Sequence, residues 1–413
     1  MKVLMFGWEF PPYNSGGLGT ACHGLTKGLA NHNIKVSFVI PKAYPDMNAD
    51  FVKLISPPEM KGAVKTIGVN SLLKGYITSK EYTQRYMNQK EFGYKTGKTN
   101  DIYGENLFEE VERYAEKAAM IAQIEQHDII HCHDWLTYEA GINAKRVSGK
   151  PLVVHLHATE FDRTAGNPNQ YVYEIEKRGF ENADKIIAVS RFAKNKIIQH
   201  YGINPNKIEV VHNAVEFNDN HLRKEEFKIK KKDKVVLFLG RITVQKGPDW
   251  FLYAAKKALE IDPNITFVFA GSGDMEPYII EKAAELGIAD KVLFSGFLRG
   301  KDIDRAYQMA DLYVMPSVSE PFGITPLEAM RNNTPVIISK QSGVSEVINH
   351  CLKVDFWDID LMVNKMMGVL QHKELKEELM SNGGKEVRKF NWNIPAKKCI
   401  KVYDELLKMH IAR

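Results

Sequence analysis

The sequence predicts an α/β protein with two doubly wound parallel-sheet domains, and three observations lead to this prediction. Short apolar, β-branched runs alternate with helical patterns along the chain, and uninterrupted apolar runs are typical of parallel strands covered on both faces. Two series of such runs flank a basic segment at residues 228–234, as expected of two α/β domains joined by a linker. At 413 residues, the chain is also long for a single hydrophobic core.

The first domain is expected over residues 1–220 and the second over residues 221–393. An insertion at 41–110 interrupts the first domain, and its length argues for extra elements rather than a structureless loop. The closing amphipathic helix, 394–413, is expected to pack back on the first domain. The expected strands lie at residues 3–6, 36–40, 129–132, 152–155, 186–189, 208–211, 235–239, 266–270, 292–295, 312–315, 336–338 and 352–354.

The composition excludes several classes of protein. A hydrophobic share of 44% and a charged share of 26% are ordinary for a soluble globular protein. The net charge of +5 is small and comes largely from the linker, so no nucleic-acid partner is expected. No apolar run reaches the roughly 18 residues of a membrane span, so we expect a cytoplasmic protein that remains compatible with peripheral membrane contact. The cysteines lack CxxC spacing and are interpreted as core residues of a reducing compartment: Cys22, Cys132, Cys351 and Cys399.

The segment from Glu320 to Glu328 points most directly to a function. It reads Glu-Pro-Phe-Gly-Ile-Thr-Pro-Leu-Glu and follows an expected strand. Thr325 is expected to be the N-cap of a helix, with Pro326 in its first turn and Glu328 completing a capping box. A capping box alone indicates only a stable helix start, but α/β sheets bind ligands at the carboxyl ends of their strands. Free N–H groups for phosphate and carboxylates for hydroxyls together predict a sugar-phosphate ligand.

Two more loops follow expected strands and carry residues suited to an anionic ligand. Gly16 and Gly17 permit close approach of the backbone to a ligand, although the spacing is neither Walker A nor GxGxxG and a plain turn is the alternative. Arg241 and Lys246 would suit a diphosphate, and the alternative is two surface cations.

Four histidines form two pairs in which the partners share one strand face: His131 with His133, and His155 with His157. A metal cluster is one interpretation. Local hydrogen bonding or contact with a ligand is the other.

Three further turns are interpreted structurally. Asp134 and Ser190 each follow a strand and are expected to be helix N-caps. Residues 271–274, Gly-Ser-Gly-Asp, predict a tight strand-to-helix turn.

Taken together and in order, these motifs resemble retaining glycosyltransferases of family 4 with the GT-B fold, in which two Rossmann-like domains face a central cleft. Residues 8–12 (Trp-Glu-Phe-Pro-Pro), 16–19 (Gly-Gly-Leu-Gly) and 133–135 (His-Asp-Trp) look like bacterial glycogen or starch synthases. The resemblance implies retaining transfer of glucose from UDP-glucose or ADP-glucose to an α-glucan or another glycan, with no metal and no cofactor beyond the nucleotide sugar.

The resemblance also implies roles for individual residues. Arg241 and Lys246 would hold the leaving diphosphate, because fixed cations must stabilise its charge where no metal does so. Glu320 would bind the hydroxyls of the transferred sugar, and His157 would lie under that sugar near its C6 hydroxyl and anomeric carbon. Glu328 would bind the ribose. The other donor-binding positions are Gly16, Gly17, Leu18, Phe322, Gly323, Ile324, Thr325, Leu327, Leu298 and Arg299.

Other functions stay open at this point. The same fold could act on a lipid-linked or cell-envelope polysaccharide acceptor, the histidines could serve a metal-dependent hydrolase, and a catalytically silent sugar-binding scaffold is a further alternative. Aromatic residues of the insertion are expected either to stack on acceptor sugars or to belong to the core: Tyr76, Tyr82, Tyr86, Phe92, Tyr94 and Tyr103.

Overall fold

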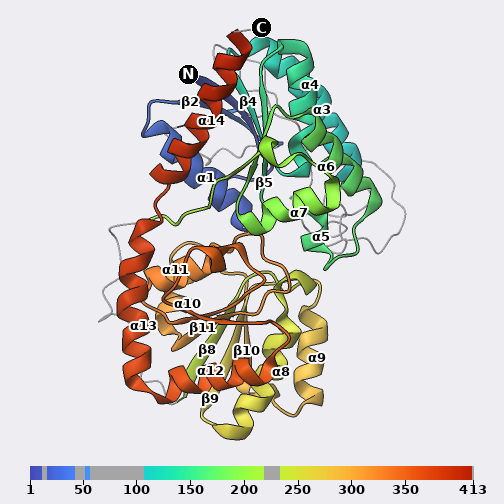
Figure 1. Ribbon diagram of the computed structural model, residues 1–413. Coiled ribbons are helices and arrows are strands. Elements are labelled where there is room, and N and C mark those ends of the chain that lie inside the picture. The colour runs from blue at the N-terminus through green and yellow to red at the C-terminus, as the bar shows by residue number, and fades with distance from the viewer. Residues whose placement is uncertain (12–15, 42–51, 56–106, 218–232, 412–413) are drawn as a thin grey trace.

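The structure is a computed structural model that describes residues 1–11, 16–41, 52–55, 107–217 and 233–411. Two parallel sheets lie one above the other, each with helices on both faces (Figure 1). The first has the strand order β3-β2-β1-β4-β5-β6-β7, and the second has the order β10-β9-β8-β11-β12-β13. Both are doubly wound, which confirms the predicted fold class.

All twelve predicted strands are present, with bounds shifted by no more than about one residue. The structure adds β3, a short strand inside the predicted insertion that pairs with β2. The strands of the first sheet are β1 Lys2–Phe6, β2 Lys35–Val39, β3 Lys53–Ile55, β4 Ile129–His133, β5 Leu152–Leu156, β6 Lys185–Ala188 and β7 Ile208–Val210. Those of the second are β8 Lys234–Leu239, β9 Ile265–Ala270, β10 Val292–Gly296, β11 Leu312–Met315, β12 Val336–Ser339 and β13 Leu352–Val354.

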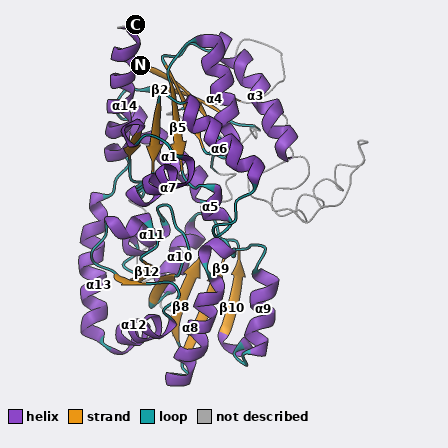
Figure 2. Ribbon diagram, turned by 45° about the vertical axis from the view of Figure 1, so that its right-hand side comes forward, coloured by secondary structure: helices purple, strands orange, loops and turns teal. Residues whose placement is uncertain are grey.

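The helices connect the strands as crossovers, and Figure 2 shows them outside the two sheets. In the first domain they are α1 Gly17–Ala30, α3 Leu107–Ile124, α4 Trp135–Ser148, α5 Glu160–Arg163, α6 Gln170–Asn182 and α7 Arg191–Tyr201. In the second they are α8 Pro248–Ile261, α9 Glu276–Glu285, α10 Lys301–Met309, α11 Thr325–Arg331, α12 Ile359–Gln371 and α13 Lys373–Glu386, and the chain closes with α14 Asn393–Ile411. Among these helices, none combines the length and the apolar character that crossing a bilayer requires.

Alternation along the strands divides the core of the first domain into two layers. Leu4 and Phe6 pack with the α3, α4 and α6 side of the sheet, whereas Val3 and Met5 pack with the α1 and α14 side. Successive side chains of a strand point to opposite faces. By the same alternation, His131 and His133 of β4 and His155 of β5 point toward α1 and α14.

Helix α14 returns from the second domain to the first, where it lies beside α1 (Figure 1). Gly24 of α1 makes the close approach possible, since a Cβ there would lie 2.1 Å from the Trp392 indole at the start of α14. Tyr403 of α14 then reaches the sheet and hydrogen-bonds His131 at 2.5 Å. The last helix is therefore part of the core of the first domain.

This packing gives a test of stability. Gly24→Ala should lower the free energy of unfolding by about 1–3 kcal/mol, because the added methyl group overpacks the contact between α1 and Trp392. Gly368→Ala is the matched control within α12, where the nearest atom to an added Cβ is 3.8 Å away. That change should stabilise the protein by about 0.5–1 kcal/mol, since alanine favours a helix. Urea unfolding measures the free energy of unfolding of both variants. Equal changes in the two would contradict the close contact between Gly24 and Trp392.

Candidate active site

The strand orders place four loops at the topological switch points of the two sheets. In the first sheet the order reverses between β1 and β4, and in the second between β8 and β11. Doubly wound sheets bind ligands outside the carboxyl ends of the strands at such points. At the ends of these four strands, or in the segments that follow them, lie Gly16 and Gly17, His133 and Asp134, Arg241 and Lys246, and Glu320.

Lys246 and Glu320 form an ion pair at the switch point of the second sheet. Lys246 ends a 3-10 turn after β8, and its Nζ donates to Oε2 of Glu320, which follows β11. Ser317 Oγ donates to the same carboxylate oxygen at 3.3 Å. Only 8% of the Glu320 side chain and 20% of the Lys246 side chain are exposed. The structure thus joins two residues that the sequence placed 74 positions apart.

Gln245 fixes the turn that carries Lys246, and the sequence analysis did not select it. Its carbonyl accepts from Val318 N at 3.0 Å, and its side-chain Nε2 donates to Ser319 O at 3.1 Å. Its Oε1 accepts from Arg241 Nη2 at 3.4 Å. Gln245 lies between Arg241 and Lys246 in the sequence, and only those two cations were predicted to bind a ligand.

The turn at residues 271–274 packs against the Arg241 loop. Ile242 N donates to Ser272 O at 3.0 Å, and Met275 N donates to Ile242 O at 3.0 Å. Gly271 adopts φ +145°, and a Cβ there would overlap Gly240 O at 1.8 Å. A tight turn was predicted here, and this contact explains why glycine occupies it.

The loop after Glu320 is held by backbone hydrogen bonds. Gly343 N donates to Glu320 O at 2.9 Å, and Val344 N donates to Phe322 O at 2.7 Å. Phe322 is buried, and Gly323 adopts φ +97°, a conformation that favours glycine. Ile324 directly precedes α11, and Leu327 lies within that helix.

The predicted N-cap at Thr325 is wrong. Helix α11 begins at Thr325 itself, Ile324 occupies the N-cap position, and no side chain caps the helix. The Thr325 hydroxyl instead accepts from Tyr313 OH at 2.8 Å. The buried Tyr313 hydroxyl needs an acceptor, and it takes the Thr325 oxygen that the capping box would have used.

Glu328 lies on α11, and the buried Tyr307 donates to its Oε2 at 3.1 Å. Burial raises the pKa of Glu328, and the Arg331 guanidinium acts in the opposite direction. Arg331 itself pairs with Asp304.

The remaining predicted positions lie at two other loops. Gly16 is the N-cap of α1, with Gly17 and Leu18 in its first turn, and an added Cβ at either glycine would meet nothing within 4 Å. Within the described residues, there is thus space for a ligand beside the Cα atoms of these two glycines. Leu298 and Arg299 follow β10, and the guanidinium of Arg299 lies 5.0 Å from the Phe297 ring centre.

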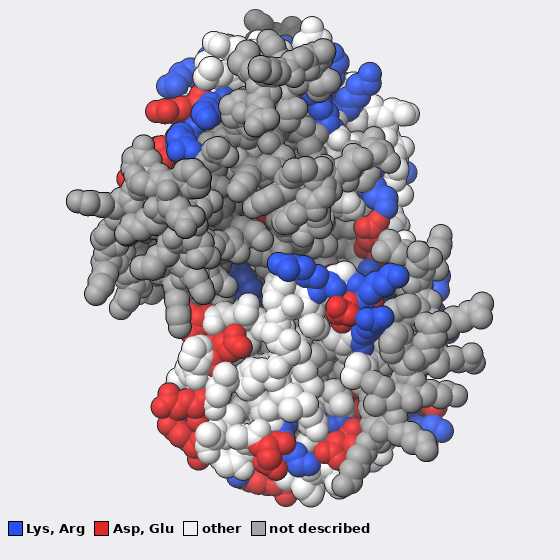
Figure 3. Space-filling view, turned by 180° about the vertical axis from the view of Figure 1, so that it is seen from behind, with Lys and Arg blue, Asp and Glu red and all other residues white. Residues whose placement is uncertain are grey.

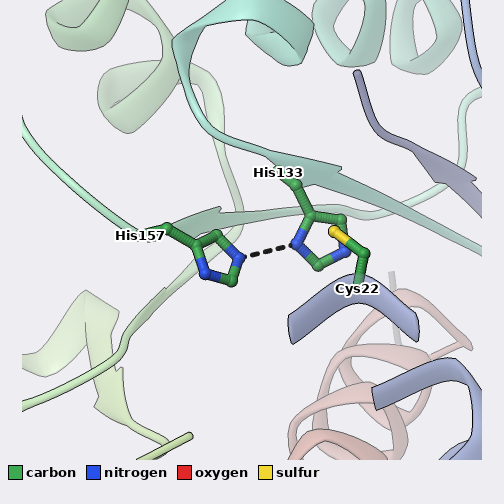
Figure 4. A group of neighbouring side chains, drawn as sticks. All are labelled: Cys22, His133 and His157. Carbon is green, nitrogen blue, oxygen red and sulfur yellow. Dashed lines mark hydrogen bonds between the residues drawn. The ribbon is translucent and has the colours of Figure 1, made fainter. Parts of the chain in front are cut away.

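His157 lies just after β5 and contacts a second histidine. Its Nε2 is 2.9 Å from Nδ1 of His133, and Cys22 of α1 lies beside the His133 ring (Figure 4). Asp134 accepts at Oδ1 from His157 N at 2.6 Å and from Ala158 N at 3.3 Å. Asp134 occupies the N-cap position of α4, but its side chain makes no cap there, which corrects that prediction.

The histidines form a stacked cluster on one face of β4 and β5. Ring centres lie 4.6 Å apart for His131 and His133 and 4.5 Å apart for His155 and His157. Within the described residues, two groups bring possible metal ligands within 4.8 Å of one another: His131, His133 and His155, and Cys22, His133 and His157.

Burial keeps these imidazoles neutral in the folded protein. It lowers the pKa of His131 to about 3, with His157 adding to the effect. Burial also lowers the pKa values of His133 and His155 well below 6.5. For His157, burial lowers the pKa, the Asp134 carboxylate raises it, and Arg163 lowers it.

The neutral cluster predicts a loss of stability in acid. As the pH falls below about 6.5, histidines of the unfolded chain bind protons that the folded chain does not, so the free energy of unfolding decreases. Each such histidine contributes a slope of up to about 1.4 kcal/mol per pH unit. His131→Leu should reduce this slope in urea titrations between about pH 6.5 and pH 5. The wild type and the variant contain the same carboxylates, so a difference between their slopes reports on the histidine. Identical slopes would contradict burial of His131 in its neutral form.

Two polar contacts join the domains beside Glu320. Ser190 caps α7 by accepting from Ala193 N, which confirms its predicted role, and its hydroxyl also donates to Pro321 O. Glu346 of the second domain accepts from Phe192 N at 2.6 Å and Arg191 N at 3.0 Å, at the first turn of α7. A carboxylate at a helix N-terminus is stabilised by the helix dipole.

A buried carboxylate makes the third contact between the domains. Asp162 of α5 is fully buried and accepts from Lys196 Nζ at 2.6 Å and from Ser319 Oγ. Lys196 Nζ also contacts Ser319 Oγ at 2.6 Å. The Lys196 ammonium, with hydrogen bonds from Ser319 and Thr159, outweighs burial and lowers the pKa of Asp162. Asp162 is marked in the sequence only by the capping-box spacing Thr159-x-x-Asp162, which the structure forms, and no local pattern marks Lys196 or Ser319.

Some predictions lie outside the described residues. These are the basic linker, apart from its last two residues, and the aromatic residues Tyr76, Tyr82, Tyr86, Phe92, Tyr94 and Tyr103.

Comparison with known proteins identifies relatives along the whole chain. An uncharacterized glycosyltransferase of Methanocaldococcus jannaschii is 30% identical over 99% of both chains. D-inositol 3-phosphate glycosyltransferase of Salinispora tropica is 28% identical, over 72% of this chain and 68% of its own. Glycogen synthase of Mycobacterium tuberculosis is 25% identical, over 84% of this chain and 80% of its own.

Solved structures share the two-domain architecture. Sucrose-phosphate synthase of Thermosynechococcus elongatus superposes with a TM-score of 0.78 at 19% identity, over 99% of both chains. Anabaena HepE, solved with UDP and glucose, superposes with a TM-score of 0.67 at 17% identity, over 98% of this chain and all of its own. At these identities the likeness concerns the fold.

Family models match both domains. The model of glycosyl transferases group 1 matches residues 219–386, and that of glycosyltransferase family 4 matches residues 94–219. Together with the full-length relative, these matches show that the chain belongs to the GT-B glycosyltransferases of group 1 and family 4.

Proposed function

We propose that this glycosyltransferase moves glucose, with retention of configuration, from UDP-glucose or ADP-glucose to an α-glucan. The donor would lie along the switch point of the second sheet, and the acceptor would meet the first domain. The observation that carries the proposal is the ion pair of Lys246 and Glu320, which lies where a doubly wound sheet binds ligands.

The two residues would act on different parts of the donor. Lys246 and Arg241 supply positive charge to the departing diphosphate, and Glu320 accepts hydrogen bonds from hydroxyls of the transferred sugar. Fixed charges of this kind stabilise a transition state without reorganising. Because both cations belong to the chain, the proposed reaction requires no metal ion.

The space beside the Cα atoms of Gly16 and Gly17, seen among the described residues, suits approach of a phosphate to the N-terminus of α1, a 14-residue helix. Figure 3 adds that Lys and Arg side chains gather near the junction of the domains on the face it shows, where an anionic donor would be attracted. The other predicted contacts, at Thr325, Leu327, Glu328, Leu298 and Arg299, belong to the same proposal.

The relatives suggest two kinds of acceptor, an α-glucan and a small polyol phosphate. Glycogen synthase matches a larger share of this chain, at 84%, which supports an α-glucan. D-inositol 3-phosphate glycosyltransferase is more similar per residue, at 28%, which supports a small polyol phosphate as the second candidate. The metal-dependent hydrolase suggested by the histidines does not suit a member of this family and is not proposed.

A panel of donors and acceptors tests the proposal. Purified protein is incubated with UDP-, ADP- and GDP-sugars, alone, with glycogen, or with inositol 3-phosphate, and nucleoside diphosphate release is measured. Release from UDP-glucose or ADP-glucose that rises with glycogen is the expected result. A rise with inositol 3-phosphate alone would select the second candidate. Release that neither acceptor increases would overturn the α-glucan proposal and direct the search to lipid-linked acceptors, with liposome co-sedimentation as the next measurement.

A further inference from the structure

We propose that His133 is a positioning residue that fixes the proton of His157 on Nδ1, so that Nδ1–H donates to the substrate. The tautomer follows from the geometry of the two rings. The role of this tautomer in catalysis rests on the proposed function, in which His157 lies beside the transferred sugar.

The two imidazoles share one hydrogen bond. Nδ1 of His133 and Nε2 of His157 are 2.9 Å apart, and Figure 4 shows these nitrogens pointing toward each other. A neutral imidazole carries one proton, so one ring donates and the other accepts. The direction of this bond decides which nitrogen of His157 carries its proton.

The second nitrogen of His133 settles the direction. His133 is fully buried, and its Nε2 has no hydrogen-bond partner among the described residues. If His157 donated, the only proton of His133 would lie on Nε2, as a buried N–H without an acceptor. Orphaned buried N–H groups are rare and costly. When His133 donates from Nδ1, its Nε2 has only a lone pair that accepts no hydrogen bond. No buried N–H group is then left without an acceptor.

The consequence appears on the far side of His157. With Nε2 accepting, its proton lies on Nδ1, which points away from His133 in Figure 4. The His157 residue is partly exposed among the described residues, which is compatible with contact between its ring and a ligand. Asp134 holds the His157 backbone through the 2.6 Å hydrogen bond. Asp134 thus holds the backbone of His157, and His133 holds its ring. The second ring nitrogen of His157, Nδ1, is then a donor.

A donor at this position suits sugar chemistry. Nδ1–H can donate to a lone pair of a sugar hydroxyl or of an oxygen that gains negative charge during transfer. The opposite tautomer would present only an acceptor. His133 would therefore act through His157 and would not touch the substrate.

Nitrogen-15 NMR of the full chain labelled at histidine tests the tautomer directly. The His157 signals are assigned by their loss in His157→Gln. We expect the proton of His157 on Nδ1 and that of His133 on Nδ1. A proton on Nε2 of His157 would overturn the proposal. Because this measurement needs no turnover, it remains decisive even if the proposed donor and acceptor prove wrong.

Two substitutions at His133 test the catalytic consequence. His133→Asn keeps an N–H donor near the position of Nδ1, whereas His133→Leu removes it. Loss of the hydrogen-bond partner of a functional histidine costs about 10- to 100-fold at metal sites, and we expect a similar fall in kcat for His133→Leu, with the donor KM nearly unchanged. His133→Asn should restore most of kcat.

His131→Leu is the matched control, because it removes another buried imidazole of β4 that makes no hydrogen bond to His157. Its kcat should stay near the wild-type value, and thermal unfolding confirms that each variant is folded in the assay. Equal loss in all three variants, or unchanged kcat in His133→Leu, would overturn the catalytic part of the proposal.

Discussion

Replacing Lys246 with alanine is expected to lower kcat by roughly 100- to 1000-fold, the usual effect of removing one fixed group that stabilises transition-state charge. Lys246 Nζ is held by Glu320 at the switch point of the second sheet, so its charge is in place before the diphosphate departs. Initial rates of nucleoside diphosphate release at saturating donor measure the effect.

The control must separate lost chemistry from lost folding. Lys246→Ala leaves the buried Glu320 carboxylate without its cation, which itself destabilises a protein. The double variant Lys246→Met with Glu320→Gln removes both charges and should fold but remain inactive. Lys257→Ala breaks an exposed ion pair with Asp360 and should leave turnover unchanged. A rate within a few-fold of wild type in the folded double variant would refute the site.

The second large effect is expected at the junction of the domains. Asp162→Ala should lower the free energy of unfolding by about 2–4 kcal/mol. The carboxylate is fully buried, and its removal leaves Lys196 unpaired and deprives Ser319 of its acceptor. The expected loss is less than for a wholly buried pair, because 19% of the Lys196 side chain is exposed. Since Ser319 precedes Glu320, turnover should fall as well.

A double-mutant cycle with Lys196→Ala isolates this contact. We expect the single variants and the double variant to be non-additive, because both singles break the same pair. Asp360→Ala, which breaks an exposed pair of the second domain, should have only a small effect on stability. Both residues belong to the first domain, so additive losses for Asp162 and Lys196 would mean that this ion pair, which presents Asp162 to Ser319 of the second domain, contributes nothing to stability.

The strands were predictable because each is a continuous apolar run, and parallel strands covered on both faces require such runs. The strand β3 was missed because Lys53–Ile55 lies in a segment without clear periodicity. The pairing of Lys246 with Glu320 was partly predictable, since both follow strands that the fold places at one switch point.

The other contacts were hidden because they depend on tertiary structure. Asp162 and Ser319 are 157 positions apart, and no local pattern relates one to the other. Thr325 has the local pattern of a cap, but Tyr313 takes its hydroxyl. Asp134 likewise sits at a cap position, yet its carboxylate binds the backbone of His157. For Thr325 and Asp134, a partner from a neighbouring strand or from the loop after it interacts with the side chain that the local pattern assigns to a helix cap.

The most direct test of the central claim compares nucleoside diphosphate release with labelled glucose incorporated into glycogen, in wild type and in the Lys246→Met, Glu320→Gln double variant. If this site transfers glucose, the wild type yields equal amounts of the two products and the double variant yields neither. Transfer that persists in the folded double variant would contradict the claim, and so would diphosphate release by the wild type without any incorporated sugar.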